Sequence, residues 1–131
     1  MLSVIFFALA GMCNAIMDKV NFHWDESIFK GSKWEQWANP AVSYKNKWKN
    51  HSNSLDGEKF PGSSTIFVWT TDLWHFAQSF MITFFVLGAL FYDGVSSIEG
   101  FPILSLIIDY VLLKMAFSKS FEIFWSKILE K

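Results

Sequence analysis

The sequence predicts an all-α integral membrane protein with about three transmembrane helices, and three observations support this class. Its 131 residues are 52% hydrophobic and 19% aromatic, and the apolar residues occur in separate blocks. The longest block, 63–92, exceeds the roughly 20 residues that a helix needs to cross a bilayer. Lysines gather between and after the blocks, which is typical of loops on the cytoplasmic side of a membrane. The length predicts a single membrane domain, 1–131.

Composition also excludes some functions. The chain has a formal net charge of −1, and all 11 of its basic residues are lysines. Without arginine there is no guanidinium surface of the kind that reads nucleic acid, so we expect no nucleic-acid partner. The single cysteine, Cys13, excludes an intrachain disulfide and any multi-cysteine metal site.

Residues 1–18 are predicted to form the first span. A secretory signal peptide and a lipoprotein signal are the alternatives for this segment. A signal peptide needs a positive amino-terminal region, which is absent here, and a lipoprotein signal needs a small residue before the cysteine, where this chain has Met12. A retained span is therefore favoured, with Asn14 near its far end.

Residues 19–62 are predicted to be a juxtamembrane loop with short interfacial helices. The spacing of Ser32 and Glu35 is that of a capping box, and Asn39-Pro40 is a typical helix start. After it, an aromatic face alternates with lysines, as in an amphipathic helix lying on a membrane surface. We expect the aromatic residues Trp34, Trp37, Tyr44 and Trp48 to contact the headgroup region, and His51 to be solvated.

Residues 63–93 are predicted to form the second span, capped by one of Ser63, Ser64 or Thr65. Unlike an ordinary span, it contains Asp72, His75 and Gln78 near its first third. An aspartate at mid-membrane costs roughly 2.5–3.5 kcal/mol, so these residues are expected near one membrane face.

A turn is predicted from Asp93 to Gly100, including Ser97, and Phe101-Pro102 is predicted to start the next helix. The third span is predicted at 101–118, antiparallel to the second, and it should continue as an amphipathic helical tail at 119–131.

The turn has no lysine, whereas seven lysines lie between the first two spans and three follow the third. The positive-inside rule therefore predicts a multi-pass protein with its N-terminus outside and its C-terminus in the cytoplasm.

The sharpest candidate site is a group of Asp and His residues that this topology brings to the cytoplasmic end. Asp18, His23, Asp72 and His75 are predicted to bind a divalent metal such as zinc, manganese or iron. Asp25 is expected to orient His23. Further polar residues within the spans could support the site, namely Asn14, Gln78, Asp109 and Lys114.

The competing interpretation is that these residues only form interhelical hydrogen bonds, cap helices, or pair with Lys114. Three functions stay open from the sequence. The first is a membrane subunit or interaction protein, bound in the lipid bilayer as a homo-oligomer or within a larger membrane complex. The second is a metal-dependent hydrolase acting on lipid-like substrates at the membrane surface. The third is an oligomeric pore or an ion or proton pathway.

Overall fold

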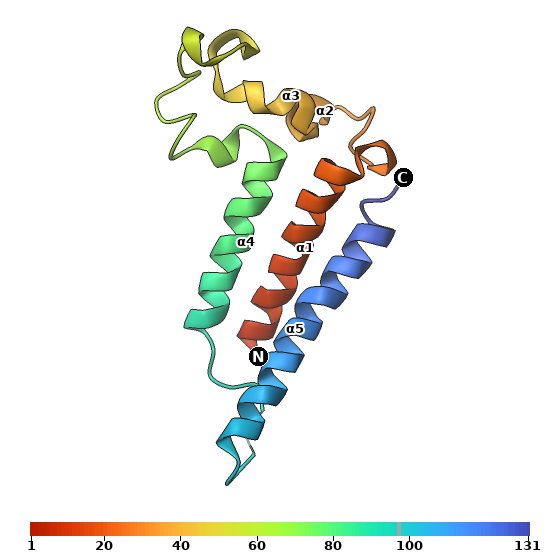
Figure 1. The fold of residues 1–131 in the computed structure, drawn as a ribbon, viewed down its shortest axis with the longest axis vertical. Helices are drawn as coiled ribbons and strands as arrows, with labels where there is room; N and C mark the ends of the chain where they lie inside the picture. Colours follow the sequence, from red (N-terminus) through yellow and green to blue (C-terminus); the bar gives the residue numbers. More distant parts are fainter. Residues whose placement is uncertain (97) are drawn as a thin grey trace.

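The computed structural model describes residues 1–96 and 98–131, and every regular element within these ranges is a helix. Three long helices form the body: α1 (Leu2–Phe22), α4 (Leu73–Leu90) and α5 (Pro102–Lys127). The segment between α1 and α4 forms a cap over one end of them (Figure 1). Its short helices are η1 (Trp24–Glu26), α2 (Glu35–Ala38), α3 (Pro40–Ser43), η2 (Tyr44–Lys47), η3 (Lys49–His51), η4 (Ser54–Asp56) and η5 (Val68–Thr70). The predicted all-helical class is confirmed.

Helix α1 lies between the other two long helices (Figure 1). On the α4 side, the ring of Phe7 packs edge-on against Phe85, with 5.5 Å between the ring centroids. On the α5 side, Gly11 permits close approach, because a Cβ atom there would lie 2.2 Å from the Phe117 carbonyl oxygen. The Ser120 hydroxyl donates a hydrogen bond to the Ala8 carbonyl, 2.7 Å away, across the same contact. Helices α4 and α5 run antiparallel, as predicted, but each packs along α1 instead of along the other.

The start of α4 differs from the sequence-based prediction. The helix begins at Leu73, not near Ser63, and Asp72 is its N-cap in an extended conformation. The three predicted caps lie in the irregular segment before it. The helix begins only after Asp72, although the segment before it contains apolar residues, because aspartate is a favoured N-cap residue whose carboxylate accepts backbone N–H groups.

The far ends of α4 and α5 are joined by a turn that depends on Asp109. Its carboxylate is buried and accepts hydrogen bonds from the Tyr92 hydroxyl (2.6 Å) and from the backbone N–H groups of Val95 and Ser96 (3.0 and 2.7 Å). Gly94 has a φ of 84°, a conformation that glycine adopts without strain. Of the predicted turn, Ser97 lies outside the described residues. Helix α5 starts at Pro102 as predicted and continues without a break to Lys127.

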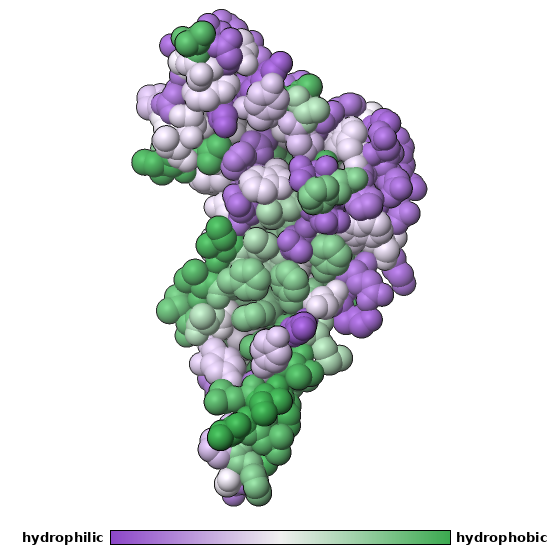
Figure 2. Space-filling model, viewed as in Figure 1, coloured by the Kyte–Doolittle hydropathy of each residue, from purple (hydrophilic) through white to green (hydrophobic). Residues whose placement is uncertain are grey.

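Two of the long helices, α1 and α4, are long and apolar enough to cross a membrane. Helix α5 is 26 residues long and contains more charged residues than α1 or α4. The C-terminal end of α1, the N-terminal end of α4 and the C-terminal end of α5 lie at the same end of the molecule (Figure 1). On the face shown in Figure 2, hydrophilic residues gather there and over the cap, whereas hydrophobic residues predominate in the opposite half.

The cap folds over a small apolar cluster that it shares with the long helices. Val20 of α1, Ala38 of α2 and Leu73 of α4 are its buried members, with Trp37 and Phe76 packed around them. Helix α3 confirms the predicted start, since the Asn39 side chain accepts the Ala41 N–H at 3.0 Å. The chain end completes the cap, because the Ile28 N–H donates to the Leu129 carbonyl at 3.0 Å.

Candidate functional site

The candidate site is built around the N-terminus of α4. Asp72 is only 2% exposed, and one of its carboxylate oxygens accepts the His75 backbone N–H at 2.9 Å. The other lies 2.7 Å from Nδ1 of the His75 ring. With the carboxylate oxygen as acceptor, Nδ1 is the donor of this hydrogen bond, and Nε2 takes no part in it. The spacing of three residues therefore produces a helix cap that also fixes an imidazole.

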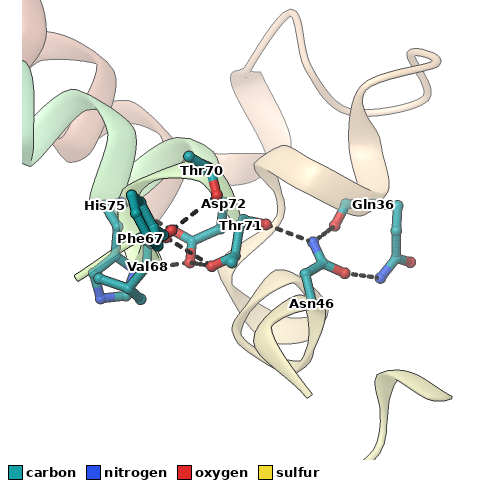
Figure 3. A network of polar contacts seen from close by, with 8 residues as sticks. All are labelled: Gln36, Asn46, Phe67, Val68, Thr70, Thr71, Asp72 and His75. Carbon is teal, nitrogen blue, oxygen red and sulfur yellow. Dashed lines mark hydrogen bonds and ion pairs between the residues drawn. The ribbon is translucent and has the colours of Figure 1, made fainter. Parts of the chain in front are cut away.

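A buried amide connects this cap to the loop (Figure 3). Asn46, at 7% exposure, donates from its side-chain nitrogen to the carbonyl oxygens of Thr71 (3.0 Å) and Gln36 (3.1 Å). Its side-chain oxygen accepts from the Gln36 amide at 3.1 Å. Buried polar groups require such partners, and these bonds hold α2, η2 and the residue before the Asp72 cap in one arrangement.

His51 is bound to the same amide. Its Nδ1 lies 3.0 Å from the Asn46 side-chain oxygen, so this histidine is exposed but not simply solvated as the sequence suggested. Asn50 and His51 have φ angles of 57° and 51°, two consecutive residues in the left-handed region. Asparagine and histidine are among the residues that tolerate this region best, and such a conformation needs support from the surrounding structure. Here the bond to Asn46 supplies it.

A cavity of about 260 Å³ opens beside this network, and we call it the loop pocket. Two ammonium groups, an imidazole, an amide and two aromatic rings contribute to its lining. They belong to Lys33, Lys59, His51, Asn46, Trp37 and Phe60. None of the described residues lining the loop pocket is acidic, so it can accommodate an anion.

A smaller cavity of about 170 Å³ lies on the other side of the Asp72 cap. Asn21 of α1, Tyr44 and His75 line it, together with Asp72 itself. The imidazole of His75 therefore faces a space that α1, α4 and the loop enclose together.

The other two predicted metal ligands have different partners. Asp18 accepts a hydrogen bond from the indole nitrogen of Trp125 at 2.9 Å. His23 lies 3.7 Å from the Glu26 carboxylate and edge-on to the Trp125 ring. Asp25, which was expected to orient His23, instead pairs with Lys30 at 2.6 Å.

The structure therefore places Asp72 and His75 in direct contact, whereas Asp18 and His23 both contact Trp125. Within residues 1–96 and 98–131, no three His, Cys, Asp or Glu side chains form a group that could hold a metal ion. The competing interpretation, caps and hydrogen bonds, describes the contacts that Asp18 and Asp72 make.

The supporting polar residues also separate. Asn14 and Gln78 are half-buried on α1 and α4. Asp109 is a residue of α5 whose carboxylate binds the turn at the opposite end of the molecule. The ammonium group of Lys114 lies 5.9 Å from the Tyr110 ring centroid. Of the contacts that the competing interpretation allowed, pairing of Lys114 with Asp72 or Asp109 is not formed, since both carboxylates bind other groups.

Sequence reasoning missed a buried ammonium group at the same end as the cap. Lys19 is fully buried, with its Nζ 3.6 Å from the Glu26 carboxylate, 3.8 Å from that of Glu130, and 3.8 Å above the Trp125 ring centroid. Its charge thus ties α1 to η1 and to the chain end. The sequence feature that could have drawn attention to Lys19 was its position directly after Asp18, a predicted site residue.

Comparisons with protein-family models, with curated proteins and with solved structures found no match to this chain. The groups that could take part in binding or chemistry are the His75 imidazole, which is bound to Asp72, and the loop pocket beside Asn46, whose described lining includes two lysines and no acidic residue.

Proposed function

We propose that this chain is a small polytopic membrane protein that acts as a membrane subunit or interaction protein, with the Asp72–His75 cluster near the cytoplasmic face. The observation that supports this most is the apolar surface left uncovered on α4 and α5. On α4, Ile82, Val86 and Leu90 are 55, 52 and 73% exposed. On α5, the exposed apolar side chains include Ile103, Leu106, Ile107, Tyr110 and Met115.

Such a surface needs a bilayer or a partner. Burying apolar area is worth about 25 cal/mol per Å², and monomeric soluble proteins rarely leave large contiguous apolar patches in water. On the face shown in Figure 2, hydrophobic residues predominate over the half of the molecule away from the cap. A lipid environment around α4 and α5 accounts for this distribution.

The central position of α1 argues that it is retained. Ala10 and Ala15 are fully buried, and Gly11 lies against the α5 backbone. Removing α1 as a signal peptide would expose the surfaces of α4 and α5 that now pack on it. We therefore propose that α1 is the first of three spans and that α5 is the third. The lysines of the segment between α1 and α4 then favour an N-terminus outside.

A groove between α4 and α5 is the surface that we assign to a partner. Two adjoining apolar cavities, of about 330 and 350 Å³, share Phe7 of α1 and Tyr110 and Leu113 of α5. Lys114 lines one of them, about 18 Å along α5 from Pro102 at 1.5 Å per residue. Among the described residues this lysine has no ion-pair partner, and an unpaired charge within a span is expensive. We propose that the groove receives an apolar helix of a partner subunit carrying a carboxylate at that depth.

Two experiments test this function. First, the protein should stay in the membrane fraction after alkaline carbonate extraction, whereas a soluble oligomer would be released. Second, a photo-cross-linking amino acid at Tyr110, in the groove, should give one protein adduct in cells, and the same group at Ile82 should not. Lys114→Gln should weaken the adduct. Adducts with lipid alone at Tyr110 would contradict the subunit role.

A further inference from the structure

We propose that the loop pocket binds a phosphate group, held by the ammonium groups of Lys33 and Lys59 beside the imidazole of His51. The proposal goes beyond the membrane-subunit function, and it does not depend on the groove or on a partner.

Charge is the first argument. Three lysines form ion pairs among the described residues: Lys19 with Glu26 and Glu130, Lys30 with Asp25, and Lys119 with Glu122. Lys33 and Lys59 form no ion pair with any residue in 1–96 or 98–131, which is also true of Lys45, Lys47 and Lys49, but these two line the same cavity. The Lys33 ammonium group lies 5.3 Å from the Trp34 ring centroid. Two uncompensated ammonium groups on one cavity attract an anion.

The second argument is that the floor of the pocket is fixed. Asn46 is more than nine-tenths buried, and its side-chain oxygen accepts from both Gln36 and His51. Because Nδ1 of His51 donates to Asn46, Nε2 of the neutral ring is an acceptor, and it can take a hydrogen bond from the hydroxyl of a monohydrogen phosphate.

The rim that carries Lys59 is fixed as well. The Lys59 N–H donates to the Lys47 carbonyl at 2.9 Å, and the Lys49 N–H donates to the Gly57 carbonyl at 3.0 Å. The Glu58 carboxylate accepts the Gly62 N–H at 2.9 Å and so closes the next turn. Lys59 therefore projects from a hydrogen-bonded loop, which lowers the entropy lost when it binds a ligand.

Size and chemistry favour phosphate. The cavity, about 260 Å³, is smaller than most pockets for drug-sized ligands, which begin near 300 Å³. Lysine binds phosphate as a point charge, and three or four oxygens can accept from donors on several sides. The source is either a lipid headgroup, since the pocket lies at the polar end of α4, or a soluble phosphate. Lysines beside a membrane contribute about 1 kcal/mol each to binding of anionic lipid, which is roughly a fivefold change in affinity.

The test uses the full chain in a maltoside detergent, which contains no phosphate. Calorimetry would measure binding of inorganic phosphate and of a short-chain phosphatidic acid, with the matching diacylglycerol as the probe without phosphate. The variant Lys33→Gln/Lys59→Gln removes the two pocket charges. The control Lys45→Gln/Lys49→Gln removes the same charge from the same loop, at residues that do not line the pocket.

We expect saturable binding of a phosphate probe and none of the diacylglycerol. Affinity should fall roughly 25-fold in the pocket variant, and by no more than about twofold in the control. Binding of phosphatidic acid alone assigns the site to a lipid headgroup, binding of inorganic phosphate alone assigns it to a soluble ligand, and binding of both assigns it to the phosphate group itself. No saturable binding of either phosphate probe, or an equal loss in both double variants, would overturn the proposal.

Discussion

The Asp72 carboxylate holds His75 twice, through its backbone N–H at 2.9 Å and through its ring Nδ1 at 2.7 Å. The first bond starts α4, and the second fixes the direction of the imidazole. One side chain thus determines both where the helix begins and what its first turn presents to the cavity beside Asn21.

Replacing Asp72 with alanine should destabilise the protein by about 1–2 kcal/mol, because an N-cap is lost and the His75 N–H is left without its partner. Unfolding in detergent, followed by circular dichroism, measures the change. Thr83→Ala is the control, since it removes a hydroxyl that bonds only within α4.

The same preparations test the predicted metal site separately. Zinc, manganese and iron would be measured in the wild type, Asp72→Ala and His75→Ala after exposure to each ion. We expect no stoichiometric metal in any of them, because Asp18 and His23 are bound elsewhere. One metal per chain in the wild type, lost from both variants, would restore the four-residue site.

Gly11→Ala should destabilise the protein by about 1–3 kcal/mol, the usual cost of overpacking. Its Cβ would collide with the Phe117 backbone oxygen, which can retreat only if α1 and α5 separate. Gly88→Ala is the matched comparison. There the new methyl group would meet the ring of Phe7, a side chain that can rotate. An equal effect of the two substitutions would argue against close backbone packing of α1 on α5.

Local signals in the sequence predicted much of the fold. Asn39-Pro40 and Phe101-Pro102 mark helix starts where the structure has them, because proline fixes φ and needs no N–H partner at the first helical position. The long apolar runs predicted α1 and α4. The start of α4 was missed because residues 66–70 are apolar enough to belong to a span, whereas they form turns and η5.

The site was less predictable, since its contacts join residues far apart in the chain. Asn46 bonds to Gln36 and to Thr71, 10 and 25 residues away, and no periodicity in the sequence indicates either bond. In the sequence, Lys33 and Lys59 look like ordinary loop lysines, and only the folded structure shows that they line the same cavity. Asp72 and His75, by contrast, are three residues apart, so their contact follows from helix geometry.

The loop that carries Lys59 should depend on pH through Glu58. The Ser64 hydroxyl, the Gly62 N–H and the Ser64 N–H donate to its carboxylate and hold the pKa of Glu58 below its ordinary value. A lowered pKa in the folded state means that the stabilisation is complete above the unfolded pKa, about 4.3, and is lost as pH falls through the folded value.

The measurement compares wild type with Glu58→Gln between about pH 7 and about pH 3. The wild type should be the more stable at neutral pH, and the difference should shrink in acid. Ser64→Ala, which removes the hydroxyl that donates to the Glu58 carboxylate, should weaken the same trend. A difference that is independent of pH would assign the effect of Glu58 to packing.

The proposed orientation predicts which ends of the helices an impermeant thiol reagent reaches in intact cells. The ends of α1, α4 and α5 that carry the cap lie together, and the α4–α5 turn lies at the opposite end, so one labelling pattern tests all three (Figure 1). With Cys13 replaced by serine, cysteines at Lys49 and Ser126 should be protected, and a cysteine at Glu99 should be labelled. Lys49 and Glu99 are exposed, so protection at Lys49 would reflect the membrane and not burial.

Labelling at Lys49 with protection at Glu99 would reverse the orientation. Labelling at both would mean that α4 does not cross the bilayer.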